Sequence, residues 1–453
     1  MTAPARPIPG NRTGPGRGLI LAAPASGSGK TLVTLGLLRA LRQRGMRVAA
    51  AKAGPDYIDP TFHAAASGGV CLNLDLWAMR PATLRGLVGR LESGADLVLC
   101  EGVMGLFDGA GPDGEAGSTA ALARFAGWPV VLVVDARRQG ASAAALVAGF
   151  ARHDPALKLA GVIFNRVAGA RHQALIETAM ARHLPDVACL GSVPETPELM
   201  LPERHLGLIP AGEHPAEAAI VHAGAAIGAS IDIENLVALA RPARLATVAP
   251  SAPLPPPGQR IAVARDDAFL FAYPAVLDGW RQAGALVTFF SPLADEPPDP
   301  TADAVYLPGG YPELHAARLA AAESCRAGLR RAAAAGTAIY GECGGYMMLG
   351  DALTDADGQV HRMTGLLALA TSFAERRLHL GYRAATLLGD GMLGRAGARF
   401  RGHEFHYATT LATGGDAPLF ALADASGGDL GASGLRRGSV AGSFIHLIDR
   451  ADA

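Results

Sequence analysis

Short apolar runs alternate with helical sequence through the first half of the chain. GLILAAPA is followed by a helical pattern from Lys30 to about Arg44, and then come MRVAAAKAG, ADLVLCEG, PVVLVVDA and LAGVIFNR. Continuous apolar strands between helices are typical of a parallel sheet that helices cover on both faces. This pattern therefore predicts an α/β domain whose ligands bind at the carboxyl ends of the strands.

The alternation stops near Arg241, where RPARLATVAPSAPLPPPGQ contains prolines that cannot continue a helix or a central strand. It restarts with RIAVARDD, LVTFFS, AVYLPGG and GTAIYGECGG, and the later segments carry more strand signals, as in a sheet with antiparallel additions. A chain of 453 residues is long enough for two cores. We predict a disordered tail at 1–17, a first domain at 18–240, a linker at 241–259 and a second domain at 260–453.

The composition excludes several function classes. Half of the residues are hydrophobic and the formal net charge is −1, so no nucleic-acid or membrane partner is expected. The first residues lack the apolar segment of a signal peptide, and we therefore expect a cytoplasmic protein. The five cysteines form no CxxC pair, and neither a disulfide framework nor a zinc site is predicted.

The segment PASGSGKT ends the first apolar run and opens the first helix. Backbone N–H groups of such a loop bind phosphate oxygens, so Gly27, Ser28 and Gly29 are predicted to contact ATP. Lys30 is predicted to reach the terminal phosphates, and the Thr31 hydroxyl to ligate Mg²⁺. A glycine-rich turn without a ligand is the alternative, which the strand–turn–helix context disfavours.

Polar residues follow three other strands at the same predicted edge of the sheet. AKAGPDYIDPTFH contains Lys52, Asp56 and Asp59, and Glu101 directly follows an apolar strand in CEGVMGLFDG. Lys52 is one of only three lysines in the chain, and the compact charge of a lysine suits phosphate oxygens. An acidic residue at the end of a strand, such as Glu101, can hold Mg²⁺. Asn165 closes a further strand, where it is predicted either to contact the adenine edge of ATP or to serve as an ordinary turn residue.

Cys343 lies between an apolar run and a helical segment in GTAIYGECGGYMMLG. Glycines on both sides permit a tight strand-to-helix turn, and a helix N-terminus lowers the pKa of a thiol. A buried structural cysteine is the default interpretation for an isolated cysteine. The glycine setting favours a nucleophile at this position.

A nucleophilic cysteine needs a base, and GSFIHLI supplies His446 at the end of an apolar strand. FRGHEFHYA offers His403 and His406 as competing candidates. The amides of Gly310, at the end of YLPGG, and of Gly344 are predicted to form an oxyanion site.

Several of these motifs together resemble a known family. The second half resembles the class I glutamine amidotransferase domain of cobyric acid synthase and cobyrinic acid a,c-diamide synthase, through PGGYPE, GECGGYM, GHEFHY and GSFIH. The first half resembles the dethiobiotin synthetase-like ATP-binding domain. AKAGPDYIDP, EGVMGLFDG and PERHLGL are most similar to the a,c-diamide synthase branch, which acts on cobyrinic or hydrogenobyrinic acid, and the resemblance covers about residues 18 to 449.

The resemblance implies a P-loop domain with a doubly wound, mostly parallel sheet, followed by a flavodoxin-like class I glutamine amidotransferase domain. It also implies a carbon–nitrogen ligase of cobalamin biosynthesis. In this family glutamine is hydrolysed to release ammonia, ATP phosphorylates a carboxylate of the corrinoid, and ammonia displaces phosphate at the a and c side chains.

The resemblance further assigns roles to individual residues. Cys343 would form the thioester and His446 would be its base. The groups that would serve ATP, Mg²⁺ and the acyl phosphate are Lys30, Thr31, Asp56, Asp59 and Glu101. We predict Asp56 and Asp59 as catalytic residues, Lys52 as an ATP-binding residue, and Thr31, Asp56 and Glu101 as the metal ligands.

The chain departs from the family pattern at two positions. Many class I amidotransferases carry an acidic residue two positions after the histidine, where this chain has Ile448, so a Cys–His dyad is expected. The first glycine of the phosphate loop is replaced by Pro24.

Other functions stay open from the sequence alone. Cobyric acid synthase and a nickel-sirohydrochlorin a,c-diamide synthase are close alternatives. A partitioning-type ATPase is a distant one, since such proteins carry an extra lysine where this chain has Ala25 and lack a glutaminase half. The metal content of the corrinoid, the order of amidation, the group that orients His446, the ammonia route and the oligomeric state, with a homodimer as one alternative, are all left undetermined.

Overall fold

The computed structural model describes residues 16–111, 113–195, 203–204, 207–208, 214–246, 248 and 251–451. It divides into two compact units: residues 1–77 and 84–249 form unit 1, and residues 78–83 and 250–453 form unit 2. The short segment 78–83 belongs to unit 2, where the Arg80 guanidinium pairs with the buried Asp449 carboxylate at 2.8 Å. The predicted tail up to residue 15 lies outside the described residues, as do residues 202, 205 and 206 of PERHLGL.

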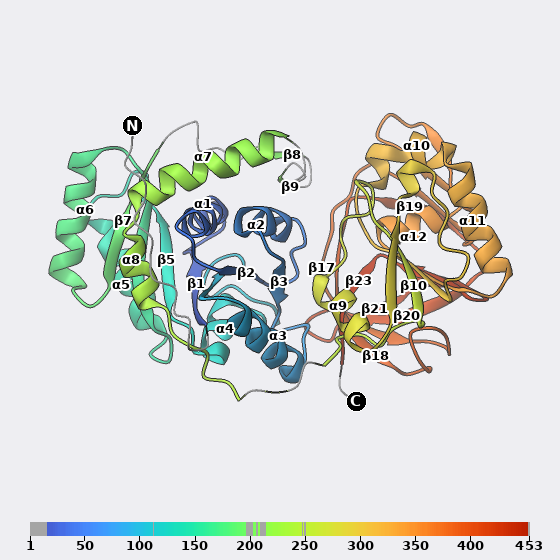
Figure 1. Ribbon diagram of the computed structural model, residues 1–453, viewed down its shortest axis with the longest axis horizontal. Coiled ribbons are helices and arrows are strands. Elements are labelled where there is room, and N and C mark those ends of the chain that lie inside the picture. Colours follow the sequence, from blue (N-terminus) through green and yellow to red (C-terminus); the bar gives the residue numbers. More distant parts are fainter. Residues whose placement is uncertain are drawn as a thin grey trace. The chain divides into compact units, whose positions relative to one another are not determined.

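Unit 1 is built on a seven-stranded parallel sheet (Figure 1) with strand order β3-β2-β4-β1-β5-β6-β7. The strands are β1 Arg17–Ala22, β2 Val48–Ala53, β3 Cys71–Leu74, β4 Leu97–Glu101, β5 Val130–Asp135, β6 Leu159–Val167 and β7 Ala188–Pro194. Because β2, β4 and β1 are neighbours, the loops at their carboxyl ends meet at one edge of the sheet.

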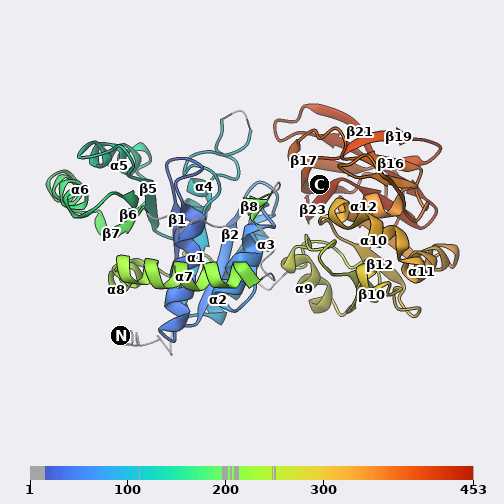
Figure 2. The same ribbon diagram turned by 90° about the horizontal axis from the view of Figure 1, so that it is seen from above.

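Helices cover both faces of this sheet. They are α1 Lys30–Gln43, α2 Asp59–Ser67, α3 Pro81–Gly94, α4 Thr119–Ala126, α5 Ser142–His153, α6 Ala170–His183, α7 His214–Ser230 and α8 Ile233–Leu239, with a ribbon of β8 Glu203–Arg204 and β9 Gly207–Leu208. One apolar core joins the sheet to α1, α2, α7 and α8, and α3 and α4 lie on the opposite face (Figure 1). Both views show α7 crossing α1 (Figures 1 and 2), where a Cβ on Gly36 would lie 2.4 Å from Ile227.

Unit 2 contains a ten-stranded mixed sheet with order β11-β10-β12-β13-β22-β21-β20-β17-β18-β23. Its first five strands are parallel: β11 Leu286–Phe290, β10 Arg260–Ala264, β12 Ala304–Leu307, β13 Ala338–Glu342 and β22 Val440–Ser443. The others are antiparallel: β21 Asp429–Arg437, β20 Ala417–Ala423, β17 His379–Leu387, β18 Arg399–His406 and β23 Ile445–Arg450. The predicted antiparallel additions are therefore confirmed.

A small second sheet and several helices complete unit 2. The sheet consists of β15 Val360–Arg362, β14 Ala352–Thr354, β16 Leu369–Ser372 and β19 Thr409–Thr413. The helices are α9 Pro274–Gln282, α10 Ala316–Ala321, α11 Glu323–Ala334 and α12 Gly344–Leu349, with short 3₁₀ turns η2 Pro292–Ala294 and η3 Pro312–His315. The predicted α/β class, with a parallel sheet first and a mixed sheet second, is confirmed. Within the described residues, no helix combines the length and apolarity needed to cross a bilayer.

Candidate active sites

The loop between β1 and α1 carries the predicted phosphate-binding sequence. Gly27 and Gly29 have φ angles of 79° and 91°, a conformation that residues with a Cβ rarely adopt. The side-chain amide of Asn165 donates to the Ser28 carbonyl at 3.0 Å, and a Cβ on Gly29 would lie 2.1 Å from that amide nitrogen. Asn165 from β6 thus holds the loop in place through its hydrogen bond to Ser28. The loop directly precedes the N-terminus of α1, and the dipole of a helix attracts phosphate to that end.

Lys30 and Thr31, the first residues of α1, reach toward β4. The buried Lys30 ammonium donates to the Met104 carbonyl at 2.5 Å, and burial lowers its pKa against the attraction of Glu101. The Thr31 hydroxyl donates to Oε1 of Glu101 at 2.8 Å. Both side chains therefore lie at the edge where β4 ends.

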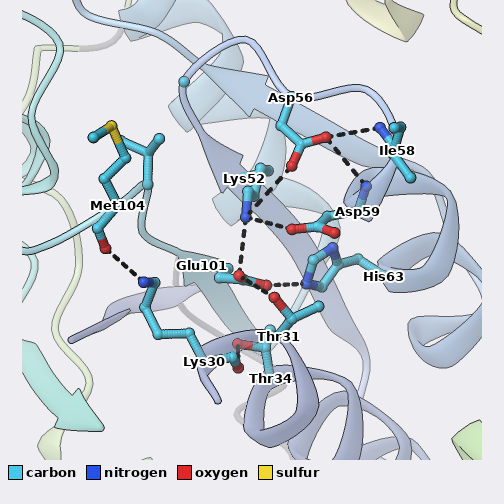
Figure 3. Close-up of polar contacts among 12 residues, drawn as sticks. Lys30, Thr31, Thr34, Lys52, Asp56, Ile58, Asp59, His63, Glu101 and Met104 are labelled. Carbon is cyan, nitrogen blue, oxygen red and sulfur yellow. Dashed lines mark hydrogen bonds and ion pairs between the residues drawn. The ribbon is translucent and has the colours of Figure 1, made fainter. Parts of the chain in front are cut away.

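Lys52 is the centre of an ion network at the carboxyl ends of β2 and β4 (Figure 3). Its ammonium lies 2.7 Å from Asp59, 2.9 Å from Glu101 and 3.9 Å from Asp56. Burial opposes its charge, but these carboxylates hold the pKa of Lys52 well above its usual value. Burial and the neighbouring Asp59 raise the pKa of Asp56 above its usual value.

His63 belongs to this network, although it was not predicted as a site residue. Its Nε2 lies 2.6 Å from Oε2 of Glu101, and the ring is fully buried (Figure 3). Burial raises the pKa of Glu101, but Lys52 and His63 outweigh that effect. They hold the pKa of this carboxylate well below its usual range. The signal was present in DPTFH, because His63 follows Asp59 by four residues and so lies on the same face of α2.

The structure brings most of the predicted nucleotide-site residues together in unit 1. The group at the shared edge consists of Lys30, Thr31, Lys52, Asp56, Asp59 and Glu101. Asn165 lies beneath the loop with its amide on Ser28, and its adenine contact stays a prediction.

Cys343 lies at the turn between β13 and α12 in unit 2. Its φ is 47° and ψ is −104°, an unfavourable backbone conformation for a residue with a Cβ. The thiol is 3% exposed and lies 3.9 Å from the Phe405 carbonyl. Burial, together with Glu313, raises its pKa. The expectation of a lowered thiol pKa is therefore wrong for the unliganded protein, because burial outweighs the dipole of a six-residue helix.

His446 lies beside Cys343, and Gly309 leaves room for both. The position of a Cβ on Gly309 is 2.3 Å from Cε1 and 3.1 Å from Nε2 of His446, and 3.2 Å from Cβ of Cys343. A hydrogen bond from the ring to the backbone of Phe271 favours the charged form of the ring.

The other two histidines influence His446 electrostatically. Burial lowers the pKa of His446 to about 3, with further contributions from His403 and His406. Burial also lowers the pKa of His403 to about 4. Burial therefore disfavours the charged forms of both the Cys343 thiol and the His446 imidazole.

His406 belongs to a separate ion network. Its Nε2 lies 3.0 Å from Glu404 and its Nδ1 lies 3.1 Å from the Ala408 carbonyl, so both ring nitrogens face acceptors. His379 stacks on this ring, and His379, Glu404 and His406 are close enough to hold a metal. The Arg383 guanidinium donates to Glu404 at 2.6 Å, however, and already balances the carboxylate charge.

The predicted oxyanion glycines lie next to each other. The amide nitrogen of Gly310 is 3.1 Å from the position of a Cβ on Gly344, and the amide of Gly344 contacts the Cys343 sulfur. Two backbone N–H groups beside a thiol are the arrangement that stabilises a tetrahedral oxyanion. The roles of all these residues in catalysis stay predictions.

We expect Gly309→Ala to lower glutamine hydrolysis about 10²-fold, because the new methyl group would displace the His446 ring from the thiol. Glutamate release by the purified variant measures this effect. Gly414→Ala is the matched control, since no atom lies within 4 Å of its Cβ position. Glutamine hydrolysis by Gly309→Ala at the rate of the unmodified protein would show that this pair is not the hydrolytic site.

Two family models match the chain. The CobQ/CobB/MinD/ParA nucleotide binding domain matches residues 19–209, and the CobB/CobQ-like glutamine amidotransferase domain matches residues 260–453. The hydrogenobyrinate a,c-diamide synthase of Brucella anthropi is 53% identical over 96% of this chain and 98% of its own length. The enzymes of the same name from Rhizobium meliloti and Rhodobacter capsulatus are 53% and 54% identical over 95% of this chain, and over 99% and 98% of their own lengths.

Proposed function

The chain belongs to the family of hydrogenobyrinate a,c-diamide synthases, and on this basis we propose that it amidates the a and c carboxylates of hydrogenobyrinate with nitrogen from glutamine. It is an ATP-dependent carbon–nitrogen ligase of cobalamin biosynthesis with a nucleotide-binding half and a glutamine amidotransferase half. Identity of 53% along nearly the full length of the relatives is the observation that carries this conclusion.

Unit 1 has the groups that carboxylate activation needs. A substrate carboxylate oxygen attacks the γ-phosphorus of ATP, ADP leaves, and an acyl phosphate forms. Lys30 neutralises charge on the transferred phosphoryl group, and Lys52 holds the substrate carboxylate or the acyl phosphate. Ammonia then attacks the acyl carbon and phosphate leaves, which gives the amide.

The residues of unit 1 also fit Mg²⁺. Thr31, Asp56 and Glu101 offer only oxygen donors, which Mg²⁺ prefers, and Thr31 and Glu101 already lie 2.8 Å apart. Mg²⁺ bound there would supply positive charge to the phosphate oxygens. The protein's own share is to hold the Glu101 carboxylate in place through Lys52 and His63.

Unit 2 has the groups that release ammonia from glutamine. The Cys343 sulfur attacks the carboxamide carbon, the resulting oxyanion accepts hydrogen bonds from the amides of Gly310 and Gly344, and ammonia leaves to give a thioester. Water then hydrolyses the thioester to glutamate. Because burial disfavours the charged forms of the thiol and the His446 imidazole, proton transfer to the ring accompanies the attack on carbon, and the ring then gives this proton to the leaving ammonia.

Substrate choice is tested by mass spectrometry of the products. With ATP, Mg²⁺ and glutamine, we expect hydrogenobyrinate to gain two amides and cobyrinate to react at least about tenfold more slowly, since the relatives are named for the metal-free substrate. Equal rates would overturn the preference for the metal-free ring. The absence of any diamide from either corrinoid would overturn the proposed function.

The alternative functions explain fewer of the observations. A partitioning-type ATPase does not account for the amidotransferase domain at residues 260–453. Cobyric acid synthase and a nickel-sirohydrochlorin a,c-diamide synthase differ from the relatives reported above in the substrate amidated. A homodimer and a cytoplasmic location stay predictions.

A further inference from the structure

Glu342 is a buried carboxyl next to the proposed nucleophile. It is the last residue of β13, directly before Cys343, and it is 2% exposed. Its Oε1 accepts the backbone N–H of Leu447 at 3.0 Å, and the Tyr306 hydroxyl lies 2.7 Å from its Oε2. Leu447 directly follows His446, so this carboxyl joins the residue before the nucleophile to the residue after the base.

The main chain brings β23 near β13, because Ser443 of β22 lies opposite Glu342 and Phe444 alone separates β22 from β23. β13 pairs with β12 and β22, whereas β23, which carries His446, pairs with β18 at the far end of the strand order. In the order of the sheet, β22, β21, β20, β17 and β18 lie between β13 and β23, and among the described residues no backbone ladder joins β13 to β23. The side chain of Glu342 bridges these two strands directly.

The environment of Glu342 favours its neutral form. Burial raises its pKa to about 8, against the hydrogen bonds from Leu447 and Tyr306. The titratable groups that face it are Tyr306 from β12, Tyr340 from β13 and Cys343 at the turn. It borders a cavity of about 20 Å³, room for one water, whose other walls include Trp280 and Phe400. Both oxygens of the carboxyl accept hydrogen bonds, Oε1 from the Leu447 N–H and Oε2 from the Tyr306 hydroxyl.

We propose that Glu342 is a positioning residue for glutamine hydrolysis, and that its carboxyl holds the Leu447 amide and thereby keeps the His446 ring within reach of the Cys343 thiol. The proposal rests on the proposed function, because it assigns Cys343 and His446 to glutamine hydrolysis. A displacement of about 1 Å between two reacting groups is enough to lower a rate about 10²-fold.

Replacing Glu342 by alanine and by glutamine separates this role from simple packing. We expect Glu342→Ala to lower kcat for glutamate release about 10²-fold with KM for glutamine within about threefold. Glu342→Gln should stay within about threefold of the unmodified protein, because its amide oxygen still accepts the Leu447 N–H. If Glu342→Gln is as impaired as Glu342→Ala, or if Glu342→Ala hydrolyses glutamine normally, the proposal is wrong.

The pH dependence of unfolding gives a readout that does not involve activity. In the unfolded chain Glu342 loses its proton near its ordinary pKa of 4.5, whereas the folded protein keeps it to about pH 8. Its contribution to stability is therefore present below pH 4.5 and is lost as the pH rises to 8. Glutamine does not titrate, so the Tm of Glu342→Gln should exceed that of the unmodified protein at pH 8 and approach it at pH 5. Equal Tm values at pH 8 would contradict the neutral carboxyl.

Two controls keep the outcomes distinct. Asp416→Ala removes another buried carboxyl of unit 2, which accepts the Ala368 N–H at 2.7 Å, and should lower Tm while kcat for glutamate release is unchanged. Amidation supported by an ammonium salt should persist in Glu342→Ala. If the unmodified protein amidates hydrogenobyrinate with neither glutamine nor ammonium, this result contradicts the proposed function. The role of Glu342 is then judged by glutamate release alone.

Discussion

Replacing Cys343 by alanine is expected to lower glutamine-dependent amidation about 10³-fold or more, because no other group can form the thioester. Amidation with an ammonium salt should stay within about twofold, since activation of the carboxylate takes place in unit 1. Both rates are measured by mass spectrometry of the corrinoid product, with glutamate release as a third readout.

Cys325→Ala is the matched control for this experiment. Cys325 is also a buried cysteine of unit 2, on α11, and it should tolerate the change with both activities retained. If the ammonium-supported reaction of Cys343→Ala is lost as completely as the glutamine-supported one while Tm is unchanged, the division of labour between the two units is refuted.

Replacing Lys30 by methionine is expected to lower amidation about 10²-fold to 10³-fold with glutamine and with ammonium alike, because phosphoryl transfer loses a positioned cation. The fold should survive. Burial lowers the pKa of Lys30, which means that its surroundings partly destabilise the charged ammonium. Methionine keeps an apolar side chain of similar length and removes the charge. Thermal unfolding and the two amidation rates are the measurements.

Lys158→Met is the matched control for Lys30→Met. Lys158 is one of only three lysines, it is exposed, and the same substitution there should leave both amidation rates unchanged. Ammonium-supported amidation by Lys30→Met at the rate of Lys158→Met would show that ATP is bound elsewhere.

The first unit was largely predictable because its signals are local. A strand, a glycine-rich turn and a helix that begins with Lys30 occupy one short segment, and such a segment has few alternative folds. Lys52 and Glu101 end parallel strands, and parallel strands place their carboxyl ends at the same edge. His63 was missed although its helical spacing from Asp59 was visible, because a lone histidine in a helix is usually structural.

In the second unit, the sequence predicted the turn at Cys343 but not the environment of its thiol. GECGG indicated a strained turn at Cys343, and the structure has a positive φ there. The thiol was nevertheless expected to have a lowered pKa, whereas burial raises it. Burial depends on which side chains from distant segments cover the sulfur, and residue spacing within one strand does not contain that information.

The amino-acid sequence by itself determined the two α/β halves, the phosphate loop, the acidic edge and the candidate nucleophile, because periodicity and turn chemistry act between residues a few positions apart. The tertiary structure alone decided the bridge from Glu342 to Leu447, the place of His446 beside Cys343 at Gly309, and the burial that raises the pKa of the thiol and lowers the pKa of the imidazole. These features arise where strands far apart in the chain pack together, since hydrogen bonding and desolvation depend on distance in space rather than on separation in sequence.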